Sequence, residues 1–304
     1  MSQYQYNKTH LSFKNSKAID DSDVANFLKK LNFNINDVLR DENVTNQFCS
    51  EYVSWIRSGK LNTIVGLNEF KFASFSQATT EAFDKFYIKN SKRRFRCFRG
   101  EYLYHSIGWR TSHDWCYIED DNLKSNDAVV ISVPFADTGN EHVSMVSVLN
   151  RCSELNIPVL IDCVYYTISS GTSVDLTYSC ITDVTFSLSK TFPVAHARIG
   201  VRLTREDCDD LLFVYEKSGY TNRLSARLGL ELIRQFSVDY MVEKYKSKQE
   251  KICDYLGISP SKTVLFGIAP IDKFVECNRG GNTNRLGLNA FLTKDLSELQ
   301  AFAK

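Results

Sequence analysis

Residues 184–203 read VTFSLSKTFPVAHARIGVRL. This stretch begins and ends with short apolar segments, which predict two β-strands. Between the strand centres lie Ser187, Ser189, Lys190 and Arg198. Lysine is rarely buried, and Lys190 stands directly beyond a strand end instead of on a solvated helix face. Hydroxyl groups and an arginine beside a lysine indicate a phosphate held by neutral donors and a guanidinium fork, with the amine free to attack a carbonyl group.

Upstream of this stretch, a strand, a helix and a second strand predict a crossover unit of a parallel sheet. Residues 128–133 (AVVISV) and 158–161 (PVLI) have the pattern of buried strands, and 142–155 has an amphipathic helical pattern. In an open α/β sheet, binding and catalytic groups gather beyond the carboxyl ends of the strands. Asp162 stands at such a position, where a carboxylate needs a partner because the surroundings have a low dielectric.

The hydrophobic periodicity of the whole chain predicts an α/β fold. We expect a three-layer α/β/α large domain with a mainly parallel sheet at 56–240, and a small α+β domain formed from both chain ends, 1–55 and 241–304. Further helices are expected at 22–39, 48–56, 79–87, 207–215, 223–236 and 240–256, with a final helix through Leu296 and Leu299. Further strands are expected at 95–98, 115–118, 264–266, 273–275 and 285–288.

The composition limits the class of protein. The chain has 304 residues, 37 Lys and Arg against 36 Asp and Glu, a net charge of +1 and 43% hydrophobic residues, which is enough for a large core. The near-zero charge gives no whole-molecule attraction to nucleic acids or membranes, and no apolar run approaches the ~20 residues of a membrane span. Nine cysteines without a CxxC pair, and no secretory leader pattern, predict reduced thiols in a cytoplasmic protein.

Three short motifs occur in order along the chain: Asp162-x-x-Tyr165, Ser187-x-Ser189-Lys190 and Arg198-x-Gly200. In order and spacing they resemble the pyridoxal-phosphate (PLP) enzymes of the fold-type I aminotransferase superfamily, classes I and II. The resemblance implies that Lys190 holds PLP as an internal aldimine and that Asp162 pairs with the protonated pyridine nitrogen, so that the ring acts as an electron sink. It implies that Tyr165 hydrogen-bonds the phenolic oxygen of the ring. The residues implied to hold the phosphate are Ser187, Ser189 and Arg198.

Weaker segments fit the same resemblance. Residues 76–82 (SQATTEA) open a predicted helix, capped by Ser76 or Thr79, whose N-terminal amides favour an anion. The residues expected on the phosphate there are Ala78, Thr79 and Thr80. Residues 99–104 (RGEYLY) resemble the segment that supplies the ring stacked on the cofactor, which makes Tyr102 the candidate.

Near the end of the chain, residues 282–288 (NTNRLGL) resemble the strand that carries the arginine for the substrate α-carboxylate. Arg285 is expected to make this bidentate contact, with Arg279 as the fallback. For this superfamily the chain is short, and the missing length falls in the segments that close over the substrate. We therefore expect an open site that accepts a large or carrier-tethered amine or carbonyl compound.

Residues 133–139 (VPFADTG) depart from the family pattern. The family usually has an Asn-Pro-rich turn ending in Thr-Gly here, and Ala136 replaces the asparagine that hydrogen-bonds the ring oxygen. Tyr165 then makes this contact alone, or Asp137 or Asn140 reaches in. Loss of a neutral donor is expected to raise the pKa of the aldimine, which leaves the reaction type open.

The function implied by the resemblance is an aminotransferase that moves an amino group between an amino acid and a keto acid or other carbonyl compound. Two alternatives stay open: another PLP reaction on the same fold (a decarboxylase, an eliminating lyase or a C–C bond-forming synthase), and a non-catalytic binding module, against which an intact Lys190 argues. The resemblance also implies a homodimer with sites at the subunit interface. The candidates to reach the neighbouring site are Tyr220, Asn222 and Arg223.

Basic residues between positions 89 and 99 alternate with Phe95 and Phe98, a pattern that also occurs in nucleic-acid patches. A solvated helix end leading into a strand explains the run better, so no nucleic-acid partner is expected. An anionic amine substrate is an intermediate alternative. The histidines do not share metal-ligand spacing with the cysteines, so no metal is expected either.

Overall fold

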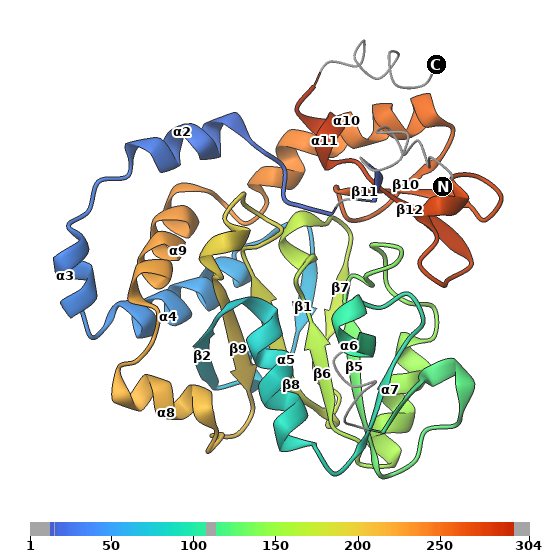
Figure 1. Cartoon of the computed structure of the whole chain (residues 1–304), viewed down its shortest axis with the longest axis horizontal. Coiled ribbons are helices and arrows are strands. Elements are labelled where there is room, and N and C mark those ends of the chain that lie inside the picture. The colour runs from blue at the N-terminus through green and yellow to red at the C-terminus, as the bar shows by residue number, and fades with distance from the viewer. Residues whose placement is uncertain (1–12, 15, 108–113, 295–304) are drawn as a thin grey trace, which may run out of the picture.

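A seven-stranded sheet forms the centre of the molecule in a computed structural model, which describes residues 13–14, 16–107 and 114–294 (Figure 1). Its strand order is β2-β9-β8-β6-β5-β3-β4. Strand β9 runs antiparallel to β2 and β8, and the other pairings are parallel. The strands are β2 Phe72–Ser76, β3 Arg94–Cys97, β4 Trp115–Tyr117, β5 Asp127–Ser132, β6 Val159–Asp162, β8 Ile181–Ser187 and β9 Gly200–Thr204. The expected mainly parallel sheet is confirmed.

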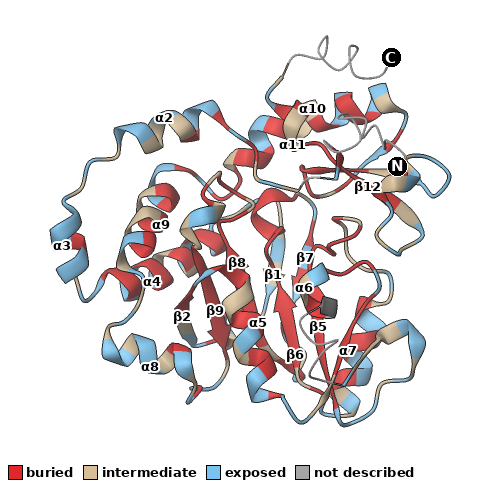
Figure 2. Ribbon diagram, in the orientation of Figure 1, coloured by how far each residue is buried: buried red, intermediate tan, exposed pale blue. Residues whose placement is uncertain are grey.

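Helices cover both faces of this sheet. Successive residues of a strand point to opposite faces, and in β5 Val129 and Ile131 join the large core cluster with α4, α7 and α9, whereas Ala128 and Val130 join a second cluster with α5. Figure 2 shows the central strands buried between these layers. The helices are α2 Ser22–Lys30, α3 Ile35–Arg40, α4 Val44–Arg57, α5 Ala78–Lys89, α6 Leu103–Ile107, α7 Met145–Glu154, α8 Leu211–Ser218, α9 Arg223–Gln235, α10 Tyr240–Leu256 and α11 Asn289–Leu292.

The C-terminal part adds a small antiparallel sheet of β10 Ser259–Pro260, β11 Phe266–Pro270 and β12 Thr283–Gly287, next to α10 and α11 (Figure 1). The N-terminal part contacts it: the ring of Phe13 lies 5.1 Å from that of Phe291 and 5.8 Å from that of Phe274. The buried Asp21 caps α2 and accepts a hydrogen bond from Tyr245 Oη in α10 (2.6 Å). Helix α4, in contrast, packs on α9 and β2 of the large sheet. The domain boundaries proposed above stay a prediction.

Some sequence-based expectations for elements were wrong. Residues 273–275 do not form a strand: Phe274 has a left-handed φ of 53° and begins the 3-10 turn η5 Val275–Cys277. The amide of Asn284 donates to the carbonyl of Lys273 (2.7 Å), which holds this segment as a turn. The helix cap is Gln77, not Ser76 or Thr79. The final helix expected through Leu296 and Leu299 lies outside the described residues.

Several elements were not anticipated from the sequence. They include the strands β2 and β10, the helix α6 and a two-stranded parallel sheet of β1 Thr63–Val65 and β7 Ser173–Asp175. The described residues also contain the 3-10 turns η1 Leu67–Glu69, η2 Ile118–Asp120, η3 Tyr166–Ile168 and η4 Ala195–Ala197.

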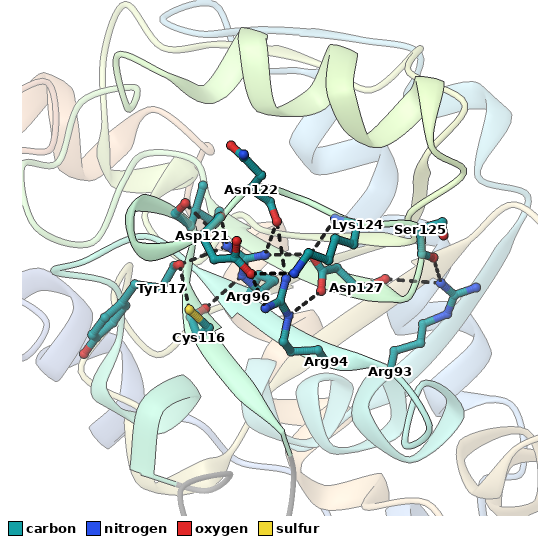
Figure 3. A network of polar contacts seen from close by, with 11 residues as sticks. Arg93, Arg94, Arg96, Cys116, Tyr117, Asp121, Asn122, Lys124, Ser125 and Asp127 are labelled. Atoms are coloured by element: carbon teal, nitrogen blue, oxygen red, sulfur yellow. Dashed lines mark hydrogen bonds and ion pairs between the residues drawn. The ribbon is translucent and has the colours of Figure 1, made fainter.

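Two arginines of the basic run, Arg94 and Arg96 in β3, are neutralised by carboxylates of the same chain (Figure 3). Arg96 is fully buried and pairs with Asp127 at 2.6 Å, and Arg94 pairs with Asp127 at 2.7 Å and Asp121 at 2.6 Å. Asp127 is the first residue of β5, so this network lies at the opposite end of the sheet from Asp162. These arginines therefore hold the sheet edge together.

The described residues contain neither a membrane-spanning helix nor a cluster of metal ligands. No helix there is long and apolar enough to cross a membrane. Within the same part of the chain, no group of three His, Cys, Asp or Glu side chains is placed to hold a metal ion.

Candidate active site

The residues singled out in the sequence meet at the carboxyl ends of three adjacent parallel strands. Ser132 ends β5, Asp162 ends β6 and Ser187 ends β8. Ser132 pairs in register with Asp162, and Asp162 pairs with Thr185 in β8. Since parallel strands end at one sheet edge, the motifs that follow them share one place in the fold.

Lys190 extends from the turn after β8 toward the N-terminal segment. Its Nζ donates to the backbone carbonyl of Ser16 (2.8 Å) and lies 3.4 Å from the Ser16 hydroxyl. The same Nζ lies 5.9 Å from the ring centre of Tyr165. The structure thus brings Lys190 and Tyr165 together, and the positive charge of Lys190 acts on Asp162.

Asp162 is a buried carboxyl group that is poorly compensated by the protein. It is 1% exposed, and its Oδ1 accepts a hydrogen bond from the Val164 amide (3.0 Å). Burial raises the pKa of Asp162 well above its ordinary value, and the charge of Glu101 raises it further. The Val164 amide and Lys190 act in the opposite direction without offsetting these effects. A cationic ring nitrogen would supply the missing charge, so the residues present fit a protonated pyridine.

The expected phosphate-binding groups also gather in one place. Arg198 Nη2 donates to Thr80 Oγ1 (2.8 Å), which joins the guanidinium to the first turn of α5. The Ser187 and Ser189 hydroxyls share a hydrogen bond of 2.8 Å. Both hydroxyls are buried, as are Ala78 and Thr79 at the start of α5. A guanidinium, hydroxyl groups and helix amides form a donor set that suits an anion.

The backbone around these groups is tightly constrained. Gly200 pairs with Ser76 on one side and Ser187 on the other. A Cβ on Gly200 would lie 2.8 Å from the Cα of Ala78, so only glycine fits there. Ala78 and Arg198 both have left-handed φ angles, 59° and 53°, which cost free energy in residues with a Cβ.

Arg285 approaches the same region from β12. It is 6% exposed, donates to the carbonyl of Ala136, and its guanidinium lies 4.2 Å from the ring centre of Phe266. Burial lowers the pKa of Arg285. Although burial raises the pKa of Tyr165, the charges of Lys190 and Arg285 lower it below its ordinary value. The depth of Arg285 counts against the expectation of an open site.

The turn after β5 departs from the family pattern, and its two polar candidates, Asp137 and Asn140, lie in different surroundings. The side-chain oxygen of Asn140 accepts a hydrogen bond from the Lys262 amide (2.9 Å), so it holds the C-terminal segment. Asp137 is 2% exposed and its Oδ1 lies 3.6 Å from Nε of Arg279. Burial raises the pKa of Asp137, although the charges of Arg279 and Arg285 oppose this. Asp137 therefore faces the arginines.

Sequence reasoning missed Glu101. This carboxylate is 7% exposed and accepts hydrogen bonds from the amide and the hydroxyl of Ser132, both at 2.7 Å. Burial raises the pKa of Glu101. The available sequence signal was Gly100, which stands directly before Glu101 and has a φ of 85° in the turn after β3. Ser16 was also missed, because nothing in its local sequence marks a contact with Lys190.

The remaining candidate residues are at least partly exposed. Tyr102 is 45% exposed and its ring stacks on Tyr104 at 6.0 Å. Asn222 caps α9, and Arg223 donates to the carbonyl of Leu39 (2.7 Å), so both side chains bind within their own chain. Tyr220 is 81% exposed and remains the candidate to reach a neighbouring subunit.

Comparison with solved structures places this fold among PLP enzymes. A C-S lyase from Staphylococcus hominis, solved with bound PLP, matches with a TM-score of 0.63 and 13% identity over 96% of this chain and 88% of that chain. The histidinol-phosphate aminotransferase from Clostridium acetobutylicum matches at 0.61 and 13%, over 95% and 96%. The L-threonine-O-3-phosphate decarboxylase from Porphyromonas gingivalis matches at 0.63 and 13%, over 95% and 96%.

These similarities confirm that the chain has the fold of the fold-type I PLP enzymes, as its motifs implied. No protein-family model matches the sequence, and a search of curated proteins finds no match. The neighbours differ in reaction, since a lyase, an aminotransferase and a decarboxylase share the fold. At this level of identity the similarity shows the fold alone, and the reaction does not follow from it.

Proposed function

We propose that this chain is a PLP-dependent enzyme and that Lys190 carries the cofactor. The observation that supports this most is the convergence of Lys190, Asp162 and Arg198 at one edge of the mainly parallel sheet. A buried carboxylate in need of a cation and a cluster of anion donors flank one lysine, and PLP presents a cationic nitrogen, an anionic phosphate and a carbonyl carbon.

When bound, PLP would act as the electron sink that stabilises negative charge at the substrate α-carbon. Asp162 would hold the proton on the ring nitrogen, and Tyr165, whose pKa is lowered by Lys190 and Arg285, would hydrogen-bond the ring oxygen. The phosphate would lie on Arg198, Thr80, Ser187 and Ser189, with Ala78 and Thr79 offering backbone amides. Tyr102 stays a candidate for ring stacking.

Lys190 would have two tasks: it would attach the cofactor through Nζ, and its amine would then carry a proton to and from the substrate α-carbon. Ser16 offers its carbonyl and hydroxyl to this Nζ, so a hydrogen-bond acceptor is ready for the amine once the substrate replaces it. Arg285, fixed by Ala136 and Phe266, would bind the substrate α-carboxylate.

The reaction we favour is amino-group transfer between an amino acid and a keto acid or other carbonyl compound. Ala136 keeps a second candidate open, a lyase, decarboxylase or synthase reaction, because its side chain offers no hydrogen bond to the ring oxygen. A half-reaction separates the two. An aminotransferase given an amino donor alone leaves the amino group on the cofactor and releases a keto acid, whereas a cofactor unchanged by every common donor would refute amino transfer.

We also propose a homodimer in a reducing, cytoplasmic compartment. Tyr220 is exposed beside α9, and the nine cysteines are free thiols, eight of them buried. The active site would bind small-molecule substrates, and no nucleic-acid partner is proposed. Sedimentation of the protein at several concentrations tests the dimer, and a monomer at all concentrations would refute it.

A further inference from the structure

Lys89 and Cys208 form a contact that does not belong to the candidate active site. Lys89 is the last residue of α5, it is exposed, and its Nζ donates to the Cys208 Sγ at 3.7 Å. Cys208 follows β9 and is 8% exposed. An amine is thus in contact with a thiol close to the surface, and both groups are nucleophiles.

The loop that carries Cys208 is fixed by its own hydrogen bonds. The hydroxyl of Thr204 donates to the carbonyl of Glu206 (2.8 Å), and the same carbonyl accepts a hydrogen bond from the Cys208 thiol (3.6 Å). Asp210 caps α8 and pairs with the buried Arg202 in β9. The sulfur is therefore held in place, whereas its lysine partner has a flexible four-carbon side chain that can close the distance.

Charged groups of the neighbouring strands face this pair. The charge of Lys89 acts on Asp183 in β8, and Cys208 acts on Arg202 in β9. A thiol in the apolar core is protected from oxidation, because the thiolate is the form that oxidants attack. Burial raises the pKa of Cys152 to about 12, for example, which keeps that thiol protonated. Cys208 lacks such apolar surroundings.

The pair joins the far ends of two elements that begin at the candidate phosphate site. Helix α5 runs from Ala78 to Lys89 and packs on β8 and β9 (Figure 1). Strand β9 begins at Gly200, in contact with Ala78, and Cys208 lies beyond its end. A bond between Lys89 and Cys208 would therefore fasten α5 to β9 at the ends remote from the phosphate-binding candidates.

We propose that hydrogen peroxide joins Cys208 and Lys89 through a sulfur–nitrogen bond, a sulfenamide. The sulfur first attacks peroxide, the O–O bond breaks, and the thiol becomes a sulfenic acid while one water leaves. Nζ, as the neutral amine, then attacks the sulfur and the S–O bond breaks. The departing hydroxyl takes a proton from Nζ and leaves as a second water.

Overall the protein loses two hydrogen atoms, and the peroxide is reduced to two molecules of water. Two thiols of a reductant reverse the bond: they become a disulfide and return the Cys208 thiol and the Lys89 amine. This modification site does not depend on the proposed function, since neither residue belongs to the candidate active site.

Mass analysis of the oxidised protein tests the proposal. The purified protein with PLP is treated with hydrogen peroxide, its remaining thiols are blocked with N-ethylmaleimide, and it is digested with a protease that cleaves after acidic residues. We expect a linked pair of peptides that contain Lys89 and Cys208, lighter by two hydrogen atoms than the two peptides together. Dithiothreitol should separate the pair.

Three variants distinguish this bond from general oxidation. Lys89→Arg keeps a positive charge and donors beside the sulfur but has no neutral amine, so the linked pair should be lost. Lys85→Arg, one turn earlier on α5, should keep the pair. Cys116→Ser, which removes a partly exposed thiol elsewhere, should keep it too.

The melting temperature gives a second readout. The bond would join residues that are 119 positions apart, so the oxidised wild type should melt roughly 5–10 °C above the reduced protein. Lys89→Arg under the same treatment should show no such rise. Oxidation of the wild type in concentrated urea should give no linked pair, which tests the need for the folded contact even if Lys89→Arg folds poorly.

Four results would overturn the proposal. They are a sulfenic acid on Cys208, trapped by dimedone, without a linked pair; a linked pair of Cys208 that persists in Lys89→Arg; the same linked pair formed in urea; and a Cys208 thiol that stays reduced at a peroxide concentration that oxidises Cys116.

Discussion

Replacing Asp162 with asparagine is expected to stabilise the cofactor-free protein. The Asp162 carboxylate is 1% exposed, and burial together with Glu101 raises its pKa. Asparagine keeps the shape and an oxygen for the Val164 amide, and removes the buried charge. If Asp162 serves to pair with a cofactor, its uncompensated charge lowers the free energy of unfolding of the cofactor-free protein.

The size of the effect follows from proton linkage. A raised pKa means that the folded state holds the proton more tightly than the unfolded state, so the stabilisation from this proton is complete below the unfolded pKa of about 3.9 and is lost as pH rises through the folded pKa. Over the roughly three pH units from there to pH 7 the limit is about 4 kcal/mol. Because the Val164 amide and Lys190 offset part of the charge, we expect about 1–3 kcal/mol at pH 7 and about zero at pH 4.

The assay is urea unfolding of the cofactor-free wild type and Asp162→Asn between pH 4 and pH 8. Asp127→Asn is the matched control, because Asp127 is equally buried but paired with Arg94 and Arg96, and its pKa is lowered despite burial. It should destabilise the protein by about 3–5 kcal/mol near pH 7, since it leaves buried arginine charge unpaired.

A different pH pattern would refute this reasoning. If Asp162→Asn destabilises the cofactor-free protein at pH 7, or changes stability equally at pH 4 and pH 7, the Asp162 carboxylate is compensated by the protein itself. Pairing of Asp162 with a cationic ring nitrogen would then be refuted. With PLP present the difference in stability between the variant and the wild type should reverse its sign. Added cofactor should then raise the melting temperature of the wild type more than that of the variant.

Three further variants address the phosphate-binding region. Ala78→Gly should stabilise the protein by about 0.5–1 kcal/mol in urea unfolding, because it releases the left-handed strain at φ 59° against the entropy cost of glycine; a loss of stability would contradict this. Gly200→Ala should destabilise the protein by about 1–3 kcal/mol, since the new Cβ meets the Ala78 backbone. An unchanged midpoint of urea unfolding would show that the strands can separate to admit the Cβ. Arg198→Gln should weaken PLP binding roughly tenfold to hundredfold but hardly change the binding of pyridoxal, which lacks the phosphate; equal losses for both would remove Arg198 from the phosphate.

The parts of the fold that sequence alone predicted are those in which one signal dominates. The buried strands β5 and β6 are apolar on both faces, and the residues after them stand at a strand end whatever the rest of the chain does. Asp162 and Lys190 were expected at this sheet edge for that reason, and the structure has them there, while the site roles of Lys190, Asp162 and Arg198 stay predictions. Strand β2 was missed because it lies at the sheet edge, with Phe72 exposed and Ser74 and Ser76 among its residues.

The elements that the sequence did not predict depend on contacts between segments that are far apart in the sequence. The segment around Phe274 has a strand-like composition, but the ring packs on Phe13 from the other end of the chain and the backbone turns. The pairing of β1 with β7 joins residues about a hundred positions apart, and neither strand carries a strong local pattern. Glu101 was missed for the same reason, since its partner Ser132 belongs to another strand.

The central claim is that Lys190 carries PLP. The most direct measurement is the absorbance spectrum of the purified protein with PLP, followed by borohydride reduction and mass analysis of the proteolytic peptides. We predict a visible band distinct from that of free PLP, its loss on reduction, and the mass of one reduced cofactor on the peptide that contains Lys190. A Lys190→Ala variant with the same band, or a reduced cofactor found on another lysine, would contradict this account.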